Sequence, residues 1–275
     1  MKNAYKLIAV DMDGTLLQSD KTVHEDTVRD IQAAVDGGIP VVYCTGRAVV
    51  ELEPYFAVLP MMRYAVCYSG ALVYDSAERK AIYRAEIARE YIEKIVRTAA
   101  EYKAMPHILM ENDSIVSSSD IQHMDQFRMG GYQPLFLKVA TQVESMEEEA
   151  KRYDSVPKIN IYFRSEVDRS RAYEKLKALP LTFAFAEKTS LEMTAEHVTK
   201  ETGLAQLAKR LGVTLGETVG IGDADNDRAV LGSVGFPVAM GNANDEIKAI
   251  CKYITADNDH NGVGAAIQYL MGEEK

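Results

Sequence analysis

Short apolar runs alternate with amphipathic stretches at both ends of the chain. Residues 7–10 are all apolar, and Val28, Ile31 and Val35 then recur at helical spacing before a pair of glycines. This order of strand, loop and helix repeats along the first 70 residues and again after residue 200. Further strands are expected at 39–44, 64–68, 218–221, 236–240 and 252–255, and further helices at 48–59 and 204–211. The pattern predicts a doubly wound, mostly parallel, Rossmann-like α/β sheet that is covered on both faces.

The middle of the chain shows a different pattern. Apolar and polar side chains alternate at residues 158–163 and again at 183–185. A period of two is typical of an antiparallel sheet with one solvated face. Helical spacing accompanies these strands at Ile87, Tyr91, Ile95 and Ala99, and at Ala172, Leu176 and Leu179. We therefore expect an inserted α+β domain at residues 83–189, within a core formed by residues 1–82 and 190–275.

The composition is that of an ordinary globular protein with one large or two modest domains. The chain has 275 residues, of which 47% are hydrophobic and 26% charged. Its net charge of −10 argues against a broad surface for nucleic acid or anionic lipid. No stretch reaches the roughly 18 apolar residues of a membrane span, and the N-terminal apolar run is too short for a signal peptide. We therefore expect a cytoplasmic protein.

The cysteines and histidines suggest no site of their own. Cys44, Cys67 and Cys251 form no CxxC pair and have apolar or aromatic neighbours, so we expect structural thiols in a reducing compartment. The five histidines show no metal-ligand spacing and are assigned no role.

Polar residues gather where the predicted strands end. They occupy positions 11–15, 45–47 and 222–227, and Lys200 opens a helix. Ligands of open α/β sheets bind beyond the carboxyl ends of the strands, so these side chains are expected to meet at one edge. Clustered carboxylates call for a divalent cation such as Mg²⁺, and a hydroxyl, a lysine and free amides suit phosphate oxygens. Since carboxylates also form aspartyl-phosphate intermediates, this set of polar side chains predicts phosphoryl transfer.

A calcium-binding loop is the main alternative for the acidic segments. That loop needs glycine at its sixth position and glutamate at its twelfth, and a loop starting at Asp11 has Leu16 and Thr22 there. The same template also fails when it starts at Asp223. A lone Asp-Gly pair is usually an ordinary turn, but the order of these segments and their place after strands favour a chemical site.

The polar segments, taken in order, resemble the four motifs of the haloacid-dehalogenase-like phosphatases. The matching motifs are residues 11–17 (DMDGTLL), 45–47 (TGR), Lys200 and 222–227 (GDADND). Residues 241–243 and 261–263 are similar to the Cof-type subfamily, and the resemblance covers nearly the whole chain. It implies a Mg²⁺-dependent phosphohydrolase that acts on a small phosphorylated metabolite, such as a sugar phosphate, through an aspartyl-phosphate intermediate.

The resemblance also implies roles for the matched residues. Asp11, Asp13 and Lys200 would be catalytic: Asp11 as the nucleophile, and Asp13 as the acid that protonates the leaving oxygen and later activates water. The metal would be held by Asp11, Asp223 and the backbone carbonyl of Asp13, and Asp227 would bind it either directly or through water. The phosphoryl group would be held by Thr45, Gly46, Arg47, Lys200 and Asn226. The inserted domain would be a mobile cap that determines substrate specificity.

Two other functions remain open at this point. A phosphomutase would carry the same motifs and return the phosphoryl group to the substrate. A non-catalytic regulator that binds a phosphorylated metabolite would be expected to have lost Asp11, Asp13 or Lys200, and all three are present. We expect a monomer or homodimer whose partner is a small molecule, with neither nucleic acid nor membrane bound. Ser69 stands where similar proteins often have asparagine.

Overall fold

The structure is a computed structural model that describes residues 5–111, 113–185 and 188–272. In this part of the chain there are two compact units, each with its own sheet and its own buried apolar cluster. The first unit is built from the residues up to Gly46, Pro54–Tyr83 and the residues from Thr199 on. The second is built from Arg47–Glu53 and Arg84–Val198. The first unit is therefore discontinuous in sequence.

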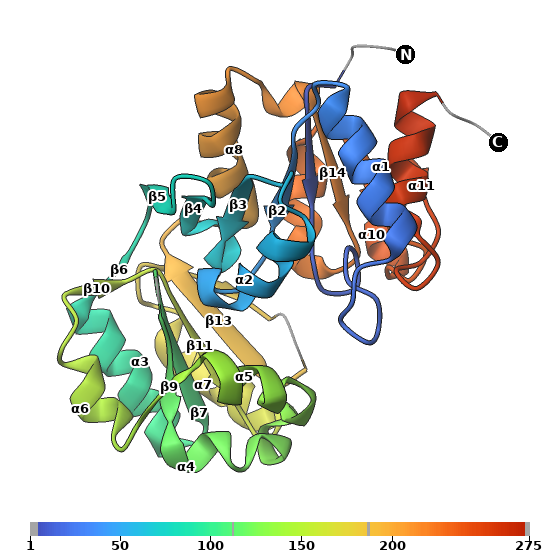
Figure 1. Ribbon diagram of the computed structural model, residues 1–275. Helices are drawn as coiled ribbons and strands as arrows, with labels where there is room; N and C mark the ends of the chain where they lie inside the picture. Colours follow the sequence, from blue (N-terminus) through green and yellow to red (C-terminus); the bar gives the residue numbers. More distant parts are fainter. Residues whose placement is uncertain (1–4, 112, 186–187, 273–275) are drawn as a thin grey trace. The chain divides into compact units, whose positions relative to one another are not determined.

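An eight-stranded sheet forms the centre of the first unit (Figure 1). Its strands lie in the order β16-β15-β14-β1-β2-β3-β4-β5, so the first strand of the chain lies in the middle. The pairings from β16 to β3 are parallel, and β3 and β4 are antiparallel. The strands are β1 (Leu7–Val10), β2 (Val41–Cys44), β3 (Tyr64–Cys67), β4 (Leu72–Asp75), β5 (Lys80–Arg84), β14 (Thr218–Gly222), β15 (Phe236–Ala239) and β16 (Tyr253–Ile254). The predicted mostly parallel, Rossmann-like sheet is confirmed.

Helices cover this sheet, so β1 and β2 are buried at every residue. Leu7 and Ala9 pack with Leu204 and Leu207 in one apolar cluster. Helices α1 and α11, blue and red in Figure 1, lie side by side. The helices of this unit are α1 (Glu25–Asp36), α8 (Lys200–Leu211), α9 (Arg228–Ser233), α10 (Asp245–Ile250) and α11 (Gly262–Met271). A further helix, α2 (Val49–Val58), belongs to this unit only from Pro54 on. Burial of both faces explains why these strands read as uninterrupted apolar runs.

The second unit is built on a six-stranded sheet in the order β12-β13-β11-β7-β8-β9, beside a separate pair of short strands, β10 and β6. β11 is antiparallel to both of its neighbours. The strands are β6 (Ile87–Ala88), β7 (Met105–Met110), β8 (Asp113–Ser117), β9 (Thr141–Val143), β10 (Ser155–Val156), β11 (Lys158–Tyr162), β12 (Leu181–Ala184) and β13 (Ser190–Ala195). The helices are α3 (Arg89–Glu101), α4 (Ser118–Ile121), α5 (Gln133–Val139), α6 (Met146–Ala150) and α7 (Glu166–Leu176).

Both faces of this sheet are buried at β11, so the prediction of one solvated face is wrong there. Ile159 and Ile161 pack with residues of α3, α6 and α7 in one apolar cluster. On the other face, Tyr162 joins a second apolar cluster. The fully buried Lys158 donates a hydrogen bond of 2.7 Å to Glu192. The alternation of polar residues along β11 therefore reflects buried polar partners and not contact with water.

Of the two main junctions between the units, one lies beside its expected position and the other lies later in the sequence. The first lies between Tyr83 and Arg84, next to the expected boundary. The second lies between Val198 and Thr199, later than the expected boundary at 189–190. The cause is β13, which pairs with both β11 and β12 in the second sheet. The roles of the two units as catalytic core and cap stay predictions.

Candidate active site

Asp11 is the residue at which the central strand of the first unit ends. Its backbone N–H donates to the carbonyl of Ile221 in β14 at 3.0 Å, so the chain leaves the sheet only after this residue. The Asp11 side chain is 7% exposed. Because β1 lies between β2 and β14 and is parallel to both, residues that follow these three strands share one edge of the sheet.

Lys200 reaches this edge from the first turn of α8. Thr199 caps the helix, and its hydroxyl accepts a hydrogen bond from the backbone N–H of Thr202. The Lys200 Nζ donates to Oδ1 of Asp11 at 2.6 Å and to Oδ1 of Asp227 at 2.7 Å. The side chain is 1% exposed. A buried ammonium is therefore held between two carboxylates that lie far from it in sequence.

Asp223 and Asp227 follow β14 in a turn that fixes both side chains. Oδ2 of Asp227 accepts hydrogen bonds from the backbone N–H groups of Asp223, at 3.0 Å, and Ala224, at 3.2 Å. Oδ1 of Asp223 accepts a hydrogen bond of 2.9 Å from the hydroxyl of Thr15. Gly14, with φ +78°, lies so close that a Cβ there would be 2.4 Å from Oδ2 of Asp223. The loops after β1 and β14 are thus locked together.

Asp11, Asp223 and Asp227 form a cluster in which one carboxylate oxygen from each residue lies within 4.8 Å of the other two. Burial, and then the nearby Asp227, raise the pKa of Asp11 well above its usual value. The same two causes, in the same order, raise the pKa of Asp223 to about 6. Three crowded oxygen donors that repel one another fit a hard divalent cation such as Mg²⁺, which would relieve the repulsion.

Lys200 compensates part of this negative charge. Burial alone would lower the pKa of the ammonium, but Asp11 and Asp227 outweigh burial and raise the pKa well above its usual value. Lys200 is therefore charged at neutral pH, and one positive charge faces three carboxylates. The charge that remains on the cluster is negative, which favours a cation there.

The other predicted residues are distributed as follows. The carboxylate of Asp13 is not part of the three-aspartate cluster. Its Oδ1 accepts a hydrogen bond of 2.7 Å from Lys21. Thr45 directly follows β2 and is buried. Gly46 comes next and is the last residue of the first unit before the chain enters the second unit. Arg47 is grouped with the second unit. The Asn226 Oδ1 is buried without a hydrogen-bond partner in the described part of the chain.

Several contacts at this edge were missed by sequence reasoning. Thr15 was seen within a motif but given no role, and its bond to Asp223 depends on the fold. Asn242 donates to the backbone carbonyl of Gly14 at 2.8 Å. The sequence signal for Asn242 was its place in the Gly-Asn-Ala segment, which by itself suggests no chemical role. Lys21 gave no signal in the sequence.

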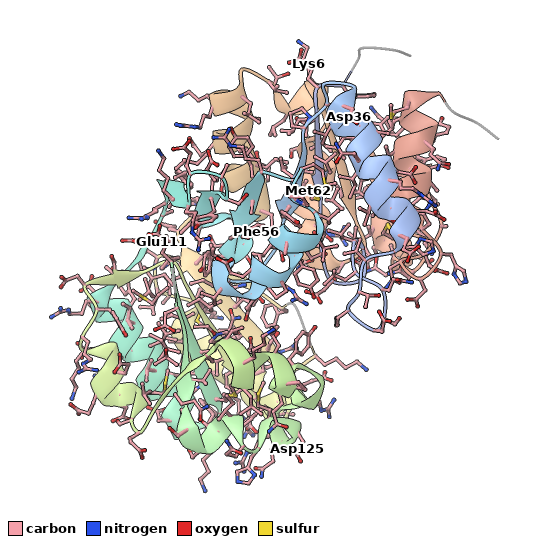
Figure 2. The ribbon with its side chains drawn as sticks, viewed as in Figure 1. Lys6, Asp36, Phe56, Met62, Glu111 and Asp125 are labelled. Carbon is pink, nitrogen blue, oxygen red and sulfur yellow. The ribbon has the colours of Figure 1, made fainter. Side chains whose placement is uncertain are left out.

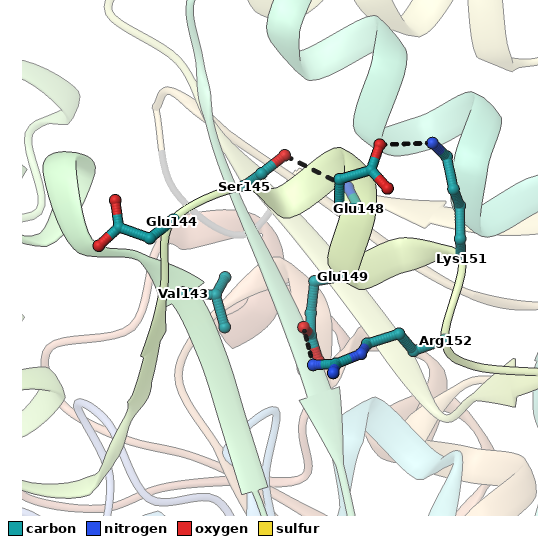
Figure 3. Close-up of a pocket in the computed structure, with 7 residues that line it drawn as sticks. All are labelled: Val143, Glu144, Ser145, Glu148, Glu149, Lys151 and Arg152. Atoms are coloured by element: carbon teal, nitrogen blue, oxygen red, sulfur yellow. Dashed lines mark hydrogen bonds and ion pairs between the residues drawn. The ribbon is translucent and has the colours of Figure 1, made fainter.

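A depression of about 750 Å³ lies elsewhere, around α6 in the second unit (Figure 3). Four of its charged side chains form two pairs: Lys151 donates to Glu148 at 2.6 Å, and Arg152 donates to Glu149 at 2.9 Å. None of the predicted site residues lines it. We assign it no chemistry. Among the described helices, none is long and apolar enough to cross a membrane.

Comparison with known proteins agrees with this geometry. The family described as haloacid dehalogenase-like hydrolase matches residues 8–267. Phosphatase YwpJ of Bacillus subtilis (strain 168) is 29% identical over 286 residues, which cover 97% of this chain and 100% of that protein. The 5-amino-6-(5-phospho-D-ribitylamino)uracil phosphatase YcsE of the same organism is 26% identical over 270 residues, which cover 97% and 96%.

The fold is shared with solved structures. A haloacid dehalogenase-like hydrolase from B. subtilis has a TM-score of 0.85 at 24% identity, with 96% of this chain and 99% of that chain covered. The resemblance inferred from the motifs is confirmed by these matches. The chain belongs to the haloacid dehalogenase-like hydrolases of the Cof type.

Proposed function

We propose that the protein is a Mg²⁺-dependent phosphohydrolase that cleaves a small phosphorylated metabolite through an aspartyl-phosphate intermediate. The observation that carries the proposal is the buried Asp11 carboxylate, 2.6 Å from the Lys200 ammonium and clustered with Asp223 and Asp227. The relatives YwpJ and YcsE, both named as phosphatases, support the reaction class. YcsE is named for a small phosphorylated metabolite, which supports the same kind of substrate here.

Asp11 and Asp13 divide the chemistry between them in this proposal. A carboxylate oxygen of Asp11 forms a bond to phosphorus, the bond from phosphorus to the ester oxygen breaks, and Asp13 gives that oxygen its proton. Water then attacks the phosphoryl group while Asp13 takes a proton from it. The products are inorganic phosphate, the free alcohol and the regenerated carboxylate of Asp11.

The remaining residues bind charge. Mg²⁺ would be held by the side chains of Asp11, Asp223 and Asp227 and the backbone carbonyl of Asp13, and it would neutralise charge between nucleophile and phosphate. Lys200, Thr45 and the backbone around Gly46 would hold phosphoryl oxygens, with Arg47 and Asn226 as further contacts. The buried, unpartnered Oδ1 of Asn226 suits a role in orienting a donor at this edge.

The two units would divide recognition between them. The charged cluster recognises a phosphoryl group and a metal, which all candidate substrates share, so it does not distinguish among them. We place that task in the second unit, as the cap of the enzyme. A cytoplasmic location is also proposed, since Cys44, Cys67 and Cys251 form no disulfide in the described part of the chain.

The proposal is tested with Asp11→Asn. The amide has the volume of the carboxylate but is a poor nucleophile, so we expect phosphate release to fall by about three powers of ten or more, with no change in the circular dichroism spectrum. The assay measures phosphate from sugar phosphates, nucleotides, flavin mononucleotide and pyridoxal phosphate, each with and without Mg²⁺.

Two outcomes would refute the proposal. One is an Asp11→Asn protein that keeps more than about a tenth of the wild-type rate. The other is a wild-type protein that works equally well in excess chelator, because the three-carboxylate cluster would then have no catalytic metal to hold.

A further inference from the structure

The loop between β1 and α1 contains a lysine in a strained backbone conformation. Lys21 has φ +68°, in the left-handed region that residues with a Cβ rarely adopt. Its Nζ nevertheless donates a hydrogen bond of 2.7 Å to Oδ1 of Asp13. A strained residue persists only where its surroundings hold it, and such residues gather at functional sites.

Hydrogen bonds within the loop hold Lys21 in this conformation. The backbone N–H of Lys21 donates to the carbonyl of Gln18, and the N–H of Gln18 donates to the carbonyl of Thr22, both at 2.9 Å. Oδ1 of Asp20 accepts from the backbone N–H and the hydroxyl of Thr22, at 2.9 and 2.6 Å. The hydroxyl of Tyr55 in α2 donates to the carbonyl of Lys21 at 3.2 Å.

The other side of this turn is fastened to the loop that precedes α11. Ser19 donates through its backbone N–H and its hydroxyl to the two carboxylate oxygens of Asp259, both at 2.7 Å. Nδ2 of Asn258 donates to the carbonyl of Leu17 at 2.9 Å. These bonds join segments about 240 residues apart in the chain. The place of Lys21 is therefore determined by the fold, independently of its bond to Asp13.

We propose that Lys21 is a positioning residue for Asp13, an inference that rests on the proposed function. The Asp13 side chain is 32% exposed, so more than one orientation of its carboxylate is sterically possible. An ammonium on an anchored turn confines the carboxylate to one orientation. Asp13 must lie within hydrogen-bond reach of the leaving oxygen to protonate it, so this orientation governs proton transfer. Asp11 and Asp13 then have separate ammonium partners, Lys200 and Lys21.

The test compares Lys21→Met with the wild type on two substrates of similar size. Phenyl phosphate has the more basic leaving group and needs a proton in the transition state, whereas p-nitrophenyl phosphate needs little protonation. We expect kcat/KM for phenyl phosphate to fall by about tenfold or more and that for p-nitrophenyl phosphate by less than about threefold. Attraction of phosphate to Lys21 would change both values alike, so the ratio isolates proton transfer.

Three further variants support the test. Lys21→Arg should keep the ratio of the two kcat/KM values close to that of the wild type, because it keeps a cation at the same place. Asp259→Ala should show a smaller loss of the same kind, because it frees Ser19. Lys6→Met is the matched control: Lys6 (Figure 2) pairs with Glu217 at the other end of β1, with side-chain exposures of 55% and 31% against 45% and 32% for Lys21 and Asp13. We expect it to leave the ratio unchanged.

The failures of the two proposals are distinguishable. If Asp13→Ala loses activity selectively on phenyl phosphate and Lys21→Met does not, Lys21 has no positioning role and the proposed function stands. If Asp13→Ala lowers kcat/KM equally for both substrates, the role of Asp13 as the acid for the leaving oxygen and the role of Lys21 are both wrong. An active Asp11→Asn protein would overturn the proposed function itself, and the role of Lys21 with it.

Discussion

Lys200 and His107 are both fully buried, and their surroundings select opposite charge states. Lys200 lies between two carboxylates and keeps its proton. The ring nitrogens of His107 lie beside two hydroxyl groups: Nε2 is 2.6 Å from that of Ser114, and Nδ1 is 3.4 Å from that of Tyr162. Burial, and then the positive charge of Lys158, lower its pKa to about 3. A neutral imidazole is therefore part of the folded second unit.

This neutral histidine predicts a pH dependence of stability. Its pKa is about 6.5 in the unfolded chain and about 3 in the folded protein. Between these values the unfolded state binds a proton that the folded state does not, so the free energy of unfolding falls as the pH falls from 6.5 toward 3. One such group contributes a slope of about 1.4 kcal/mol per pH unit.

Urea denaturation of the wild type and of His107→Gln from pH 7 to pH 4 measures this slope. Glutamine does not titrate and can still hydrogen-bond Ser114, so we expect the variant to lose less stability on acidification than the wild type. The comparison between the two proteins removes the contribution of the other titrating groups. Parallel curves over this range would show that His107 is not the group responsible.

At the scale of elements, apolar runs were sufficient to locate the parallel strands of the first sheet. In the second sheet, the sequence pattern did not show which strand faces are buried or where the sheet ends. Strands such as β1 are buried on both faces and read as continuous apolar segments. β11 was located correctly, but its polar face was assigned to water because a buried pair such as Lys158 and Glu192 leaves the same alternating pattern as solvent exposure. The early end assigned to the insert has a related cause, since β13 (Ser190–Ala195) pairs within the second sheet and no local signal shows this.

The place of α8 depends on a close approach between its backbone and the turn after β3. A Cβ on Gly203 would lie 2.7 Å from Cα and O of Gly70 and 2.8 Å from Cγ1 of Val66. A Cβ on Gly70, with φ +98°, would lie 1.8 Å from the carbonyl oxygen of Thr199. These two glycines bring the first turn of the helix, and with it Lys200, close to the strand ends.

We therefore expect Gly203→Ala to destabilise the protein and to slow it. Backbone atoms must move to admit the methyl group, which typically costs about 1–3 kcal/mol, and Lys200 would move with the helix. Thermal unfolding and kcat measure the two effects. Gly232→Ala is the control, because a Cβ at Gly232 in α9 meets nothing within 4 Å. If both variants behaved alike, close packing at Gly203 would not be what places the helix.

At the scale of the whole molecule, the convergence of the motifs was predictable and its details were not. Asp11, Lys200, Asp223 and Asp227 follow or begin elements whose order implies a common edge, and the structure brings their side chains together. Lys21 could not be predicted, because its bond to Asp13 depends on the conformation of an irregular loop fastened to residues about 240 positions away. Periodicity carries no information about such loops.

The existence of two units predicts that substrate preference is separable from chemistry. Replacing residues 84–198 by a short flexible linker removes the second sheet together with β13 and leaves the first sheet and the aspartate cluster. We expect slow hydrolysis of p-nitrophenyl phosphate to remain and the ranking among larger metabolites to disappear. The same phosphate-release panel measures both. A soluble, folded deletion variant that kept the ranking of the full-length protein would contradict this division.

The central position of β1 has a consequence for synthesis on the ribosome. β1 pairs with β2 on one side and with β14 on the other, and β14 is made about 210 residues later. At about 5–20 residues per second, the apolar strand β1 has one unpaired backbone edge in the nascent chain for roughly 10–40 s. The second unit, nearly continuous in sequence, is complete before β14 appears. Chaperones that shield apolar segments are therefore most needed while the second unit is already folding and the C-terminal part of the first unit has not yet been made.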